Sequence, residues 1–405
     1  MHAVDRPETL GFDAARLGRI RGWMEGYVAG GRYPFACTVI ARRGEIAYYD
    51  YFGNRDVEAS TPYALDTIVR IYSMTKPITT VAALMLYEEG RLHLDDPLAV
   101  FLPEFAQPLV LRDGARHLDQ VERAHETLTL QHLLTHTSGL VYGSQGGLLG
   151  EAYKARGVSF GPAGGGLAAN VKRLSDLPLL FEPGRRWNYG VSTDLLGRVV
   201  EVVSGQTLDG FFRERILEPL AMADTGFEVA EENLGRLAKL YGPGGEGAMV
   251  QRDGNADSEF RAGQVDTFSG GGGLLSTAGD YLRFAEMLRR GGEYGGARLL
   301  GPRTVALMTA NHLPGTIAEL GPTPWTEASF EGLGFGLGVS VMGNPARARL
   351  SGSPGDYGWG GVASTVFWVD PVEDMTVLFL TQLSPSHSYP NRKELRALVY
   401  QALVN

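Results

Sequence analysis

The spacing of hydrophobic and polar positions predicts sheet segments at both ends of the chain and helices between them. Near the start, apolar residues recur with helical spacing over residues 12–30, which predicts an amphipathic helix. Two runs rich in Val, Ile and Tyr follow at 36–41 and 45–51, and the short polar link between them is typical of a hairpin. Near the other end, the pattern predicts strands at 335–341, 362–369 and 375–381 and a closing helix over 391–404.

The middle of the chain is helical in pattern, with predicted helices at 76–89, 128–134, 193–204 and 208–216. A sheet built from both chain ends, with helices inserted between, predicts an α/β domain beside an all-α domain. We place the sheet domain at 1–84 and 285–405 and the helical domain at 85–284. Ligand sites are common where domains meet, so we expect the functional site at this interface.

Composition narrows the class of protein. The chain has 405 residues, 44% of them hydrophobic and 20% charged, so it can bury a sizeable core. A net charge of −9 without a Lys/Arg cluster argues against nucleic-acid or membrane partners. The polar N-terminus and the lack of a long apolar run predict a cytoplasmic location. Cys37, the single cysteine, lies in an apolar run and is predicted to be a buried thiol.

A candidate nucleophile lies where the extended stretch 67–71 gives way to a helix, in the sequence Ser73-Met74-Thr75-Lys76. Residues three apart on a helix lie one above the other, so Ser73 and Lys76 can share a hydrogen bond and the lysine can take the serine proton. The unpaired N–H groups and the dipole of the first turn suit an oxyanion. The alternative is an ordinary helix start with a serine cap and an exposed lysine.

Two further segments favour the catalytic interpretation. Tyr189 precedes the predicted helix 193–204, and beside a cationic lysine its phenolate is favoured and can pass a proton. Trp359, Gly360 and Gly361 open a predicted strand, and glycines there let a backbone N–H approach a ligand. Taken singly, each has a structural alternative: Tyr189 as a packed aromatic, and the glycines as a tight entrance to a strand. The glycine-rich segment that begins at Tyr142 is expected to line one rim of the cleft.

Two other motifs are rejected. Residues 157–161 match the G-x-S-x-G pattern around Ser159, but that motif needs a strand before the serine and a helix after it. Pro162 and a run of glycines follow instead. His132 and His136 have a spacing often used for zinc, but Leu133 stands where a metalloprotease has glutamate and no third ligand is nearby. We therefore predict structural histidines and no metal.

Taken in order, these segments resemble the serine β-lactamase and penicillin-binding-protein superfamily, and most closely its family VIII carboxylesterases. Ser73-x-x-Lys76 corresponds to the first motif, Tyr189-Gly190-Val191 to the Y-x-N motif, and Trp359-Gly360-Gly361 to the K-T-G position. The stretches 133–140 and 270–280 also match. The resemblance implies an antiparallel sheet flanked by terminal helices, a helical domain and no cofactor. It also implies that Ser73 attacks an ester, that Lys76 and Tyr189 move the proton, and that the N–H groups of Ser73 and Val362 form the oxyanion hole.

Two positions depart from the β-lactamase pattern. Val191 stands where β-lactamases carry an asparagine for the substrate amide, and Trp359 where they carry a lysine for the substrate carboxylate. Both changes make the pocket more apolar, so the sequence predicts hydrolysis of short- to medium-chain esters, with Trp359, Gly360, Gly361 and Tyr142 contacting the substrate. The alternatives are an acyltransferase, a weak β-lactamase, a D-amino-acid peptidase or amide hydrolase, and a penicillin-binding sensor or pseudoenzyme. The sequence leaves the oligomeric state open.

Overall fold

An antiparallel eight-stranded sheet organises the computed structural model, which describes residues 1–245, 248–321 and 329–404. Its strand order is β12-β13-β14-β15-β16-β1-β2-β3. Cys37 of β1 lies opposite Leu380 of β16, so the two ends of the chain meet in the middle of the sheet. The strand bounds are β1 Phe35–Arg42, β2 Glu45–Asp56, β3 Thr61–Pro62, β12 Leu333–Phe335, β13 Ser340–Met342, β14 Tyr357–Gly360, β15 Val366–Asp370 and β16 Met375–Leu380.

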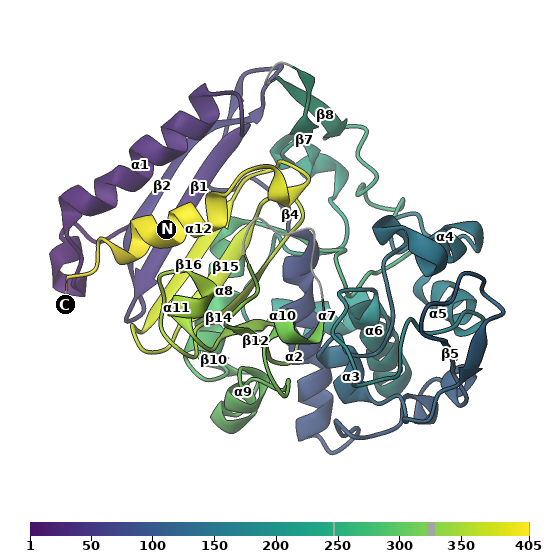
Figure 1. Ribbon diagram of the computed structural model, residues 1–405. Coiled ribbons are helices and arrows are strands. Elements are labelled where there is room, and N and C mark those ends of the chain that lie inside the picture. Colours follow the sequence, from purple (N-terminus) through teal and green to yellow (C-terminus); the bar gives the residue numbers. More distant parts are fainter. Residues whose placement is uncertain (246–247, 322–328, 405) are drawn as a thin grey trace.

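Two helices from opposite ends of the chain cover one face of the sheet, α1 (Ala14–Ala29) and α12 (Asn391–Tyr400) (Figure 1). Glu394 joins them, because its Oε2 accepts hydrogen bonds from Trp23 Nε1 at 2.8 Å and Tyr27 OH at 2.7 Å. Apolar positions predicted for the first helix are buried against the sheet, which confirms that helix. They are Leu17, Ile20, Met24 and Tyr27.

The opposite face of the sheet carries α8 (Ala278–Arg289), which packs on β15 and β16. Every residue from Thr75 to Leu86 of α2 (Thr75–Glu88) is buried, and α2 packs against α6 in the helical region (Figure 1). The helices of that region are α3 Leu130–Leu134, α4 Gly147–Ala155, α5 Leu167–Ser175, α6 Ser192–Ser204 and α7 Leu208–Phe212, the last continued by a π turn over Arg213–Leu217. Because α2 is enclosed on all sides, its N-terminal end is held rigidly where the two regions meet.

The remaining elements are short. Two-stranded pairs are formed by β4 Val69–Arg70 with β9 Leu275–Ser276, β5 Leu109–Leu111 with β6 Val121–Arg123, β7 Leu240–Pro243 with β8 Met249–Asp253, and β10 Glu293–Tyr294 with β11 Ala297–Arg298. Short helices lie at α9 Pro302–Met308, α10 Ile317–Leu320 and α11 Pro345–Ala348.

Two predicted strands near the C-terminal end are wrong. The run 335–341 is split into β12 and β13, because the chain turns between them at Gly338, whose φ is +73°. The run 362–369 begins too early, since residues 362–365 belong to the turn between β14 and β15, and β15 starts at Val366. The N-terminal hairpin is confirmed and is longer than predicted.

The division into two domains stays a prediction. Its boundary at 84/85 falls inside α2 and its boundary at 284/285 inside α8. The fold itself is confirmed: an antiparallel sheet flanked by terminal helices, with a helical region beside it. Cys37 is fully buried as predicted, and burial raises the pKa of its thiol to about 12.

Candidate active site

Ser73 lies in a 3₁₀ turn, Tyr72–Met74, between β4 and α2. The residue before it, Tyr72, has a φ of +44°, a left-handed conformation that is strained for a tyrosine and persists only where the surroundings enforce it. The preceding strand is firmly anchored: Gln382 accepts from the Arg70 N–H and donates to the Arg70 carbonyl, both at 3.0 Å. The predicted junction of an extended stretch and a helix is therefore present at Ser73.

Lys76 is fully buried and its amine is saturated with hydrogen bonds. Nζ lies 3.2 Å from Ser73 Oγ, 2.9 Å from Tyr142 OH and 2.6 Å from the carbonyl oxygen of Gly271. An ammonium group has three N–H donors, and three acceptors surround it here. This geometry rules out the alternative of an exposed surface lysine.

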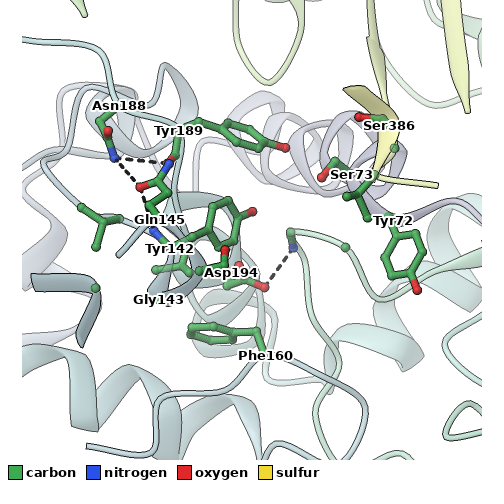
Figure 2. Close-up of a pocket in the computed structure, with 18 of the residues that line it drawn as sticks. Tyr72, Ser73, Tyr142, Gly143, Gln145, Phe160, Asn188, Tyr189, Asp194 and Ser386 are labelled. Atoms are coloured by element: carbon green, nitrogen blue, oxygen red, sulfur yellow. Dashed lines mark hydrogen bonds between the residues drawn. The ribbon is translucent and has the colours of Figure 1, made fainter. Parts of the chain in front are cut away.

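Tyr189 lies three residues before α6 and its ring extends towards Ser73 (Figure 2). Its ring centroid is 4.6 Å from Lys76 Nζ, within the range of a cation–π contact. Its backbone carbonyl accepts from Gln145 Nε2 at 2.7 Å and from Asn188 Nδ2 at 3.1 Å. These bonds fix the loop, so the tyrosine ring is held against the lysine.

Trp359 lies in β14 and contacts Tyr189 directly: its indole Nε1 donates to Tyr189 OH at 3.0 Å. Phe330 stacks on the indole with ring centroids 6.4 Å apart, and Phe335 meets it edge-on at 5.3 Å. The polar edge of the indole therefore faces the tyrosine hydroxyl. That the rest of the ring gives the substrate an apolar surface stays a prediction.

Tyr142, predicted at the rim of the cleft, lines the cavity and also accepts a hydrogen bond from Lys76. Burial, together with the neighbouring Tyr189 and Asp194, holds the pKa of Tyr142 well above its usual range. This shift favours the neutral phenol over the phenolate.

The turn after β14 carries Gly361 and Val362, which line the same cavity as Ser73. The Gly361 N–H donates to Thr365 O at 3.0 Å and its carbonyl accepts from Arg392 at 2.8 Å. A Cβ on Gly361 would lie 2.4 Å from the carbonyl oxygen of Ile71, so only glycine fits there. Val362 was predicted on a strand but lies in this turn, because the Gly361–Thr365 bond reverses the chain. Gly360 ends β14 at the same place.

A cavity of about 1330 Å³ connects these residues. Both Ser73 and Val362 line it, and so do Tyr142, Tyr189, Trp359, Gly360 and Gly361. All the predicted site residues except Lys76 therefore line one cavity, and Lys76 contacts two of the lining residues, Ser73 and Tyr142.

The sequence did not point to Asp194 or Gly271. Asp194 is in the first turn of α6, and its Oδ1 accepts from the Gly271 N–H at 3.0 Å (Figure 2). The available signal for Asp194 was an acidic residue directly before Leu195 and Leu196 in the first turn of a predicted helix. Gly271 acts through its carbonyl oxygen, which no residue type reveals.

The rejected motifs have structural roles. Ser159 is exposed in a loop between α4 and α5, with a helix rather than a strand before it, so it is not a nucleophile elbow. His132 accepts from the Thr129 N–H at 3.2 Å at the start of α3. His136 is buried 4.8 Å from the ring of Tyr189, and burial together with the charge of Lys76 holds its pKa well below its usual range.

This fold and this arrangement of serine, lysine and tyrosine define a serine hydrolase of the β-lactamase type. The chain belongs to the beta-lactamase family, whose model matches residues 20–401.

Among the described residues, no helix is long and apolar enough to cross a bilayer.

Characterised and uncharacterised relatives are similar over most of their lengths. Esterase EstB from Burkholderia gladioli is 34% identical over 97% of this chain and 98% of that protein. Protein Rv1367c from Mycobacterium tuberculosis (strain ATCC 25618 / H37Rv) is 36% identical over 87% of this chain and 86% of that protein. Among solved structures, "EstCE1, a hydrolase with promiscuous acyltransferase activity" has a TM-score of 0.81 and 28% identity, covering 97% of this chain and 99% of that one.

Proposed function

We propose that the protein is a serine carboxylesterase that hydrolyses short- to medium-chain esters through an acyl-enzyme on Ser73. The observation that carries the proposal is the contact of Lys76 with Ser73 at 3.2 Å, combined with the hydrogen bond from Trp359 to Tyr189 at 3.0 Å. The first contact places the serine nucleophile beside the lysine. The second shows that the tyrosine hydroxyl accepts a hydrogen bond.

In the proposed reaction, Ser73 Oγ attacks the ester carbonyl and its proton passes to the Lys76–Tyr189 unit. The N–H groups of Ser73 and Val362 stabilise the oxyanion, which is worth several kcal/mol in the transition state. The same unit returns the proton to the leaving alcohol. A water molecule then repeats the sequence and releases the acid.

The preference for uncharged esters rests on two side chains. Val191 is buried directly before α6, and its side chain has no amide group that could bind a substrate. Trp359 gives its one N–H donor to Tyr189, so it presents only aromatic surface to the cavity. A β-lactam would leave its amide and carboxylate poorly solvated, at about 1–3 kcal/mol each. The likeness to esterase EstB supports the same substrate class.

Transfer of the acyl group to an alcohol is the second candidate activity. EstCE1, whose structure is similar, is a hydrolase with promiscuous acyltransferase activity. The same acyl-enzyme would serve both reactions, and the acceptor decides the product. Added primary alcohols should then divert part of the acyl group from acid to a new ester, which gas chromatography measures.

The deciding experiment is a turnover panel. We expect p-nitrophenyl acetate and butyrate to be hydrolysed well, with kcat/KM falling steeply for palmitate, and a chromogenic cephalosporin to be far slower. A higher kcat/KM for the cephalosporin than for the butyrate would show a β-lactamase instead. A nitrophenol burst without steady turnover would show a sensor that is acylated once. Release of D-amino acids from peptides without ester turnover would show a peptidase.

A further inference from the structure

Asp194 is a buried carboxylate beside the catalytic groups. Its side chain accepts from Ser269 Oγ at 2.5 Å and from the Gly271 N–H at 3.0 Å, both on Oδ1. Only 1% of the residue is exposed, yet it lines the same cavity as Ser73. A buried charge is costly unless it is paired and hydrogen-bonded, so its presence here calls for a partner.

Asp194 is linked to Lys76 indirectly, through the backbone of Gly271. The Gly271 carbonyl is the shortest of the three contacts of Lys76 Nζ, at 2.6 Å. A Cβ on Gly271 would lie 2.4 Å from Asp194 Oδ2, so the backbone packs directly against the carboxylate. Asp194 therefore fixes the position of the carbonyl that holds the lysine.

The opposite charges of Asp194 and Lys76 are a second link between the two residues. The three hydrogen-bond acceptors of Lys76 are a serine, a tyrosine and a carbonyl, none of which carries a full negative charge. Burial raises the pKa of Asp194, and the positive charge of Lys76 acts in the opposite direction. The other titratable groups facing the lysine are Tyr142, Tyr189 and His136, and the pKa shift of His136 shows that this imidazole is disfavoured as a cation.

We propose that Asp194 is a positioning residue that holds the Gly271 carbonyl on Lys76 and balances the lysine charge, and so sets the pH range of catalysis. This inference rests on the proposed function. With the negative charge removed, the Lys76–Tyr189 unit gives up its proton more readily. The acid limb of the pH profile of kcat/KM then moves to lower pH.

The test is Asp194→Asn, which keeps the shape and one oxygen acceptor but removes the charge. We expect the acid limb for p-nitrophenyl butyrate to move down by roughly 1 pH unit, the scale of one nearby buried charge. Ser269→Ala is the matched control, because it removes one donor to Asp194 and leaves the charge. Its kcat should fall several-fold, with the acid limb unmoved.

A superimposable profile for Asp194→Asn and wild type would overturn the proposal, and so would an equal shift in Ser269→Ala. If Asp194→Asn does not fold, Gly271→Ala replaces it. Its Cβ should displace the carbonyl and lower kcat at least ~10-fold without moving the acid limb, and unchanged kcat would contradict the positioning role. Failure of the proposed function is distinguishable, since wild type would then show no ester turnover at any pH.

Discussion

Ser73 and Ser159 both occur in short motifs of serine hydrolases, but they lie in very different surroundings. Ser73 lies in a turn fixed by β4 and α2, 3.2 Å from the buried amine of Lys76. Ser159 is exposed in a loop, where its Oγ accepts only a long hydrogen bond, 3.4 Å from the Gly161 N–H. The contrast teaches that a nucleophile is defined by a rigid backbone and a buried base rather than by a short motif.

The strongest test of this contrast exchanges each serine for alanine. Ser73→Ala should lower ester kcat by at least ~10⁴-fold, because the acyl-enzyme cannot form. Ser159→Ala should stay within about twofold of wild type. A fluorophosphonate should label wild type at Ser73, as read by peptide mass spectrometry. Labelling at Ser159, or an equal loss in both variants, would reverse the assignment.

A second test asks whether Lys76 and Tyr189 act together. Lys76→Ala and Tyr189→Phe should each lower kcat by roughly 10³-fold, the range expected when a general base is lost. The double variant should be little worse than either, because residues that act as one unit are non-additive. Losses that multiply in the double variant would show that the two groups work independently. Circular dichroism controls for folding.

Gly361 and Gly161 allow a matched comparison of how much room the backbone leaves for a side chain at each site. Gly361→Ala should lower kcat by about 10²-fold, because a Cβ 2.4 Å from the Ile71 carbonyl displaces the turn that carries Val362. Gly161→Ala should be close to neutral, since its Cβ would lie 3.6 Å from Ser159 Oγ, an ordinary contact. Steady-state kinetics on both variants settles the point. Equal activities would mean that the turn after β14 tolerates movement.

The smallest expected effect concerns one hydrogen bond near Ser73. Trp359→Phe keeps the ring and removes the donor to Tyr189, so kcat should fall roughly 10-fold, a value of about 1.4 kcal/mol typical of one hydrogen bond. Trp187→Phe is the control: its ring stacks on Tyr189 at 6.1 Å, but its Nε1 has no partner among the described residues. Similar losses in both variants would assign the effect to packing.

The sequence predicted what depends on regular spacing. Helices α1, α2 and α6, of 16, 14 and 13 residues, are confirmed, because a long run shows its type even where its ends are uncertain. Two strands near the C-terminal end were misplaced, because the apolar pattern does not show that the chain reverses at Gly338 and over residues 362–365. Ser73, Lys76, Tyr189 and Trp359 were found as motif residues.

Contacts that arise only in three dimensions were missed. Asp194 and Gly271 lie 77 residues apart in the sequence and meet only after folding. The direction of the Trp359 N–H was equally invisible, because the residue type fixes the group but not its orientation.

The pairing of β1 with β16 has a consequence for biosynthesis. Cys37 and Leu380 are neighbours in the sheet, yet almost the whole chain must be made before the second reaches the first. At roughly 5–20 residues per second, β1 waits on the order of tens of seconds for its central partner. During that time its open edge can pair with other chains. We therefore expect the yield of native protein to depend on temperature and chaperones, through topology alone.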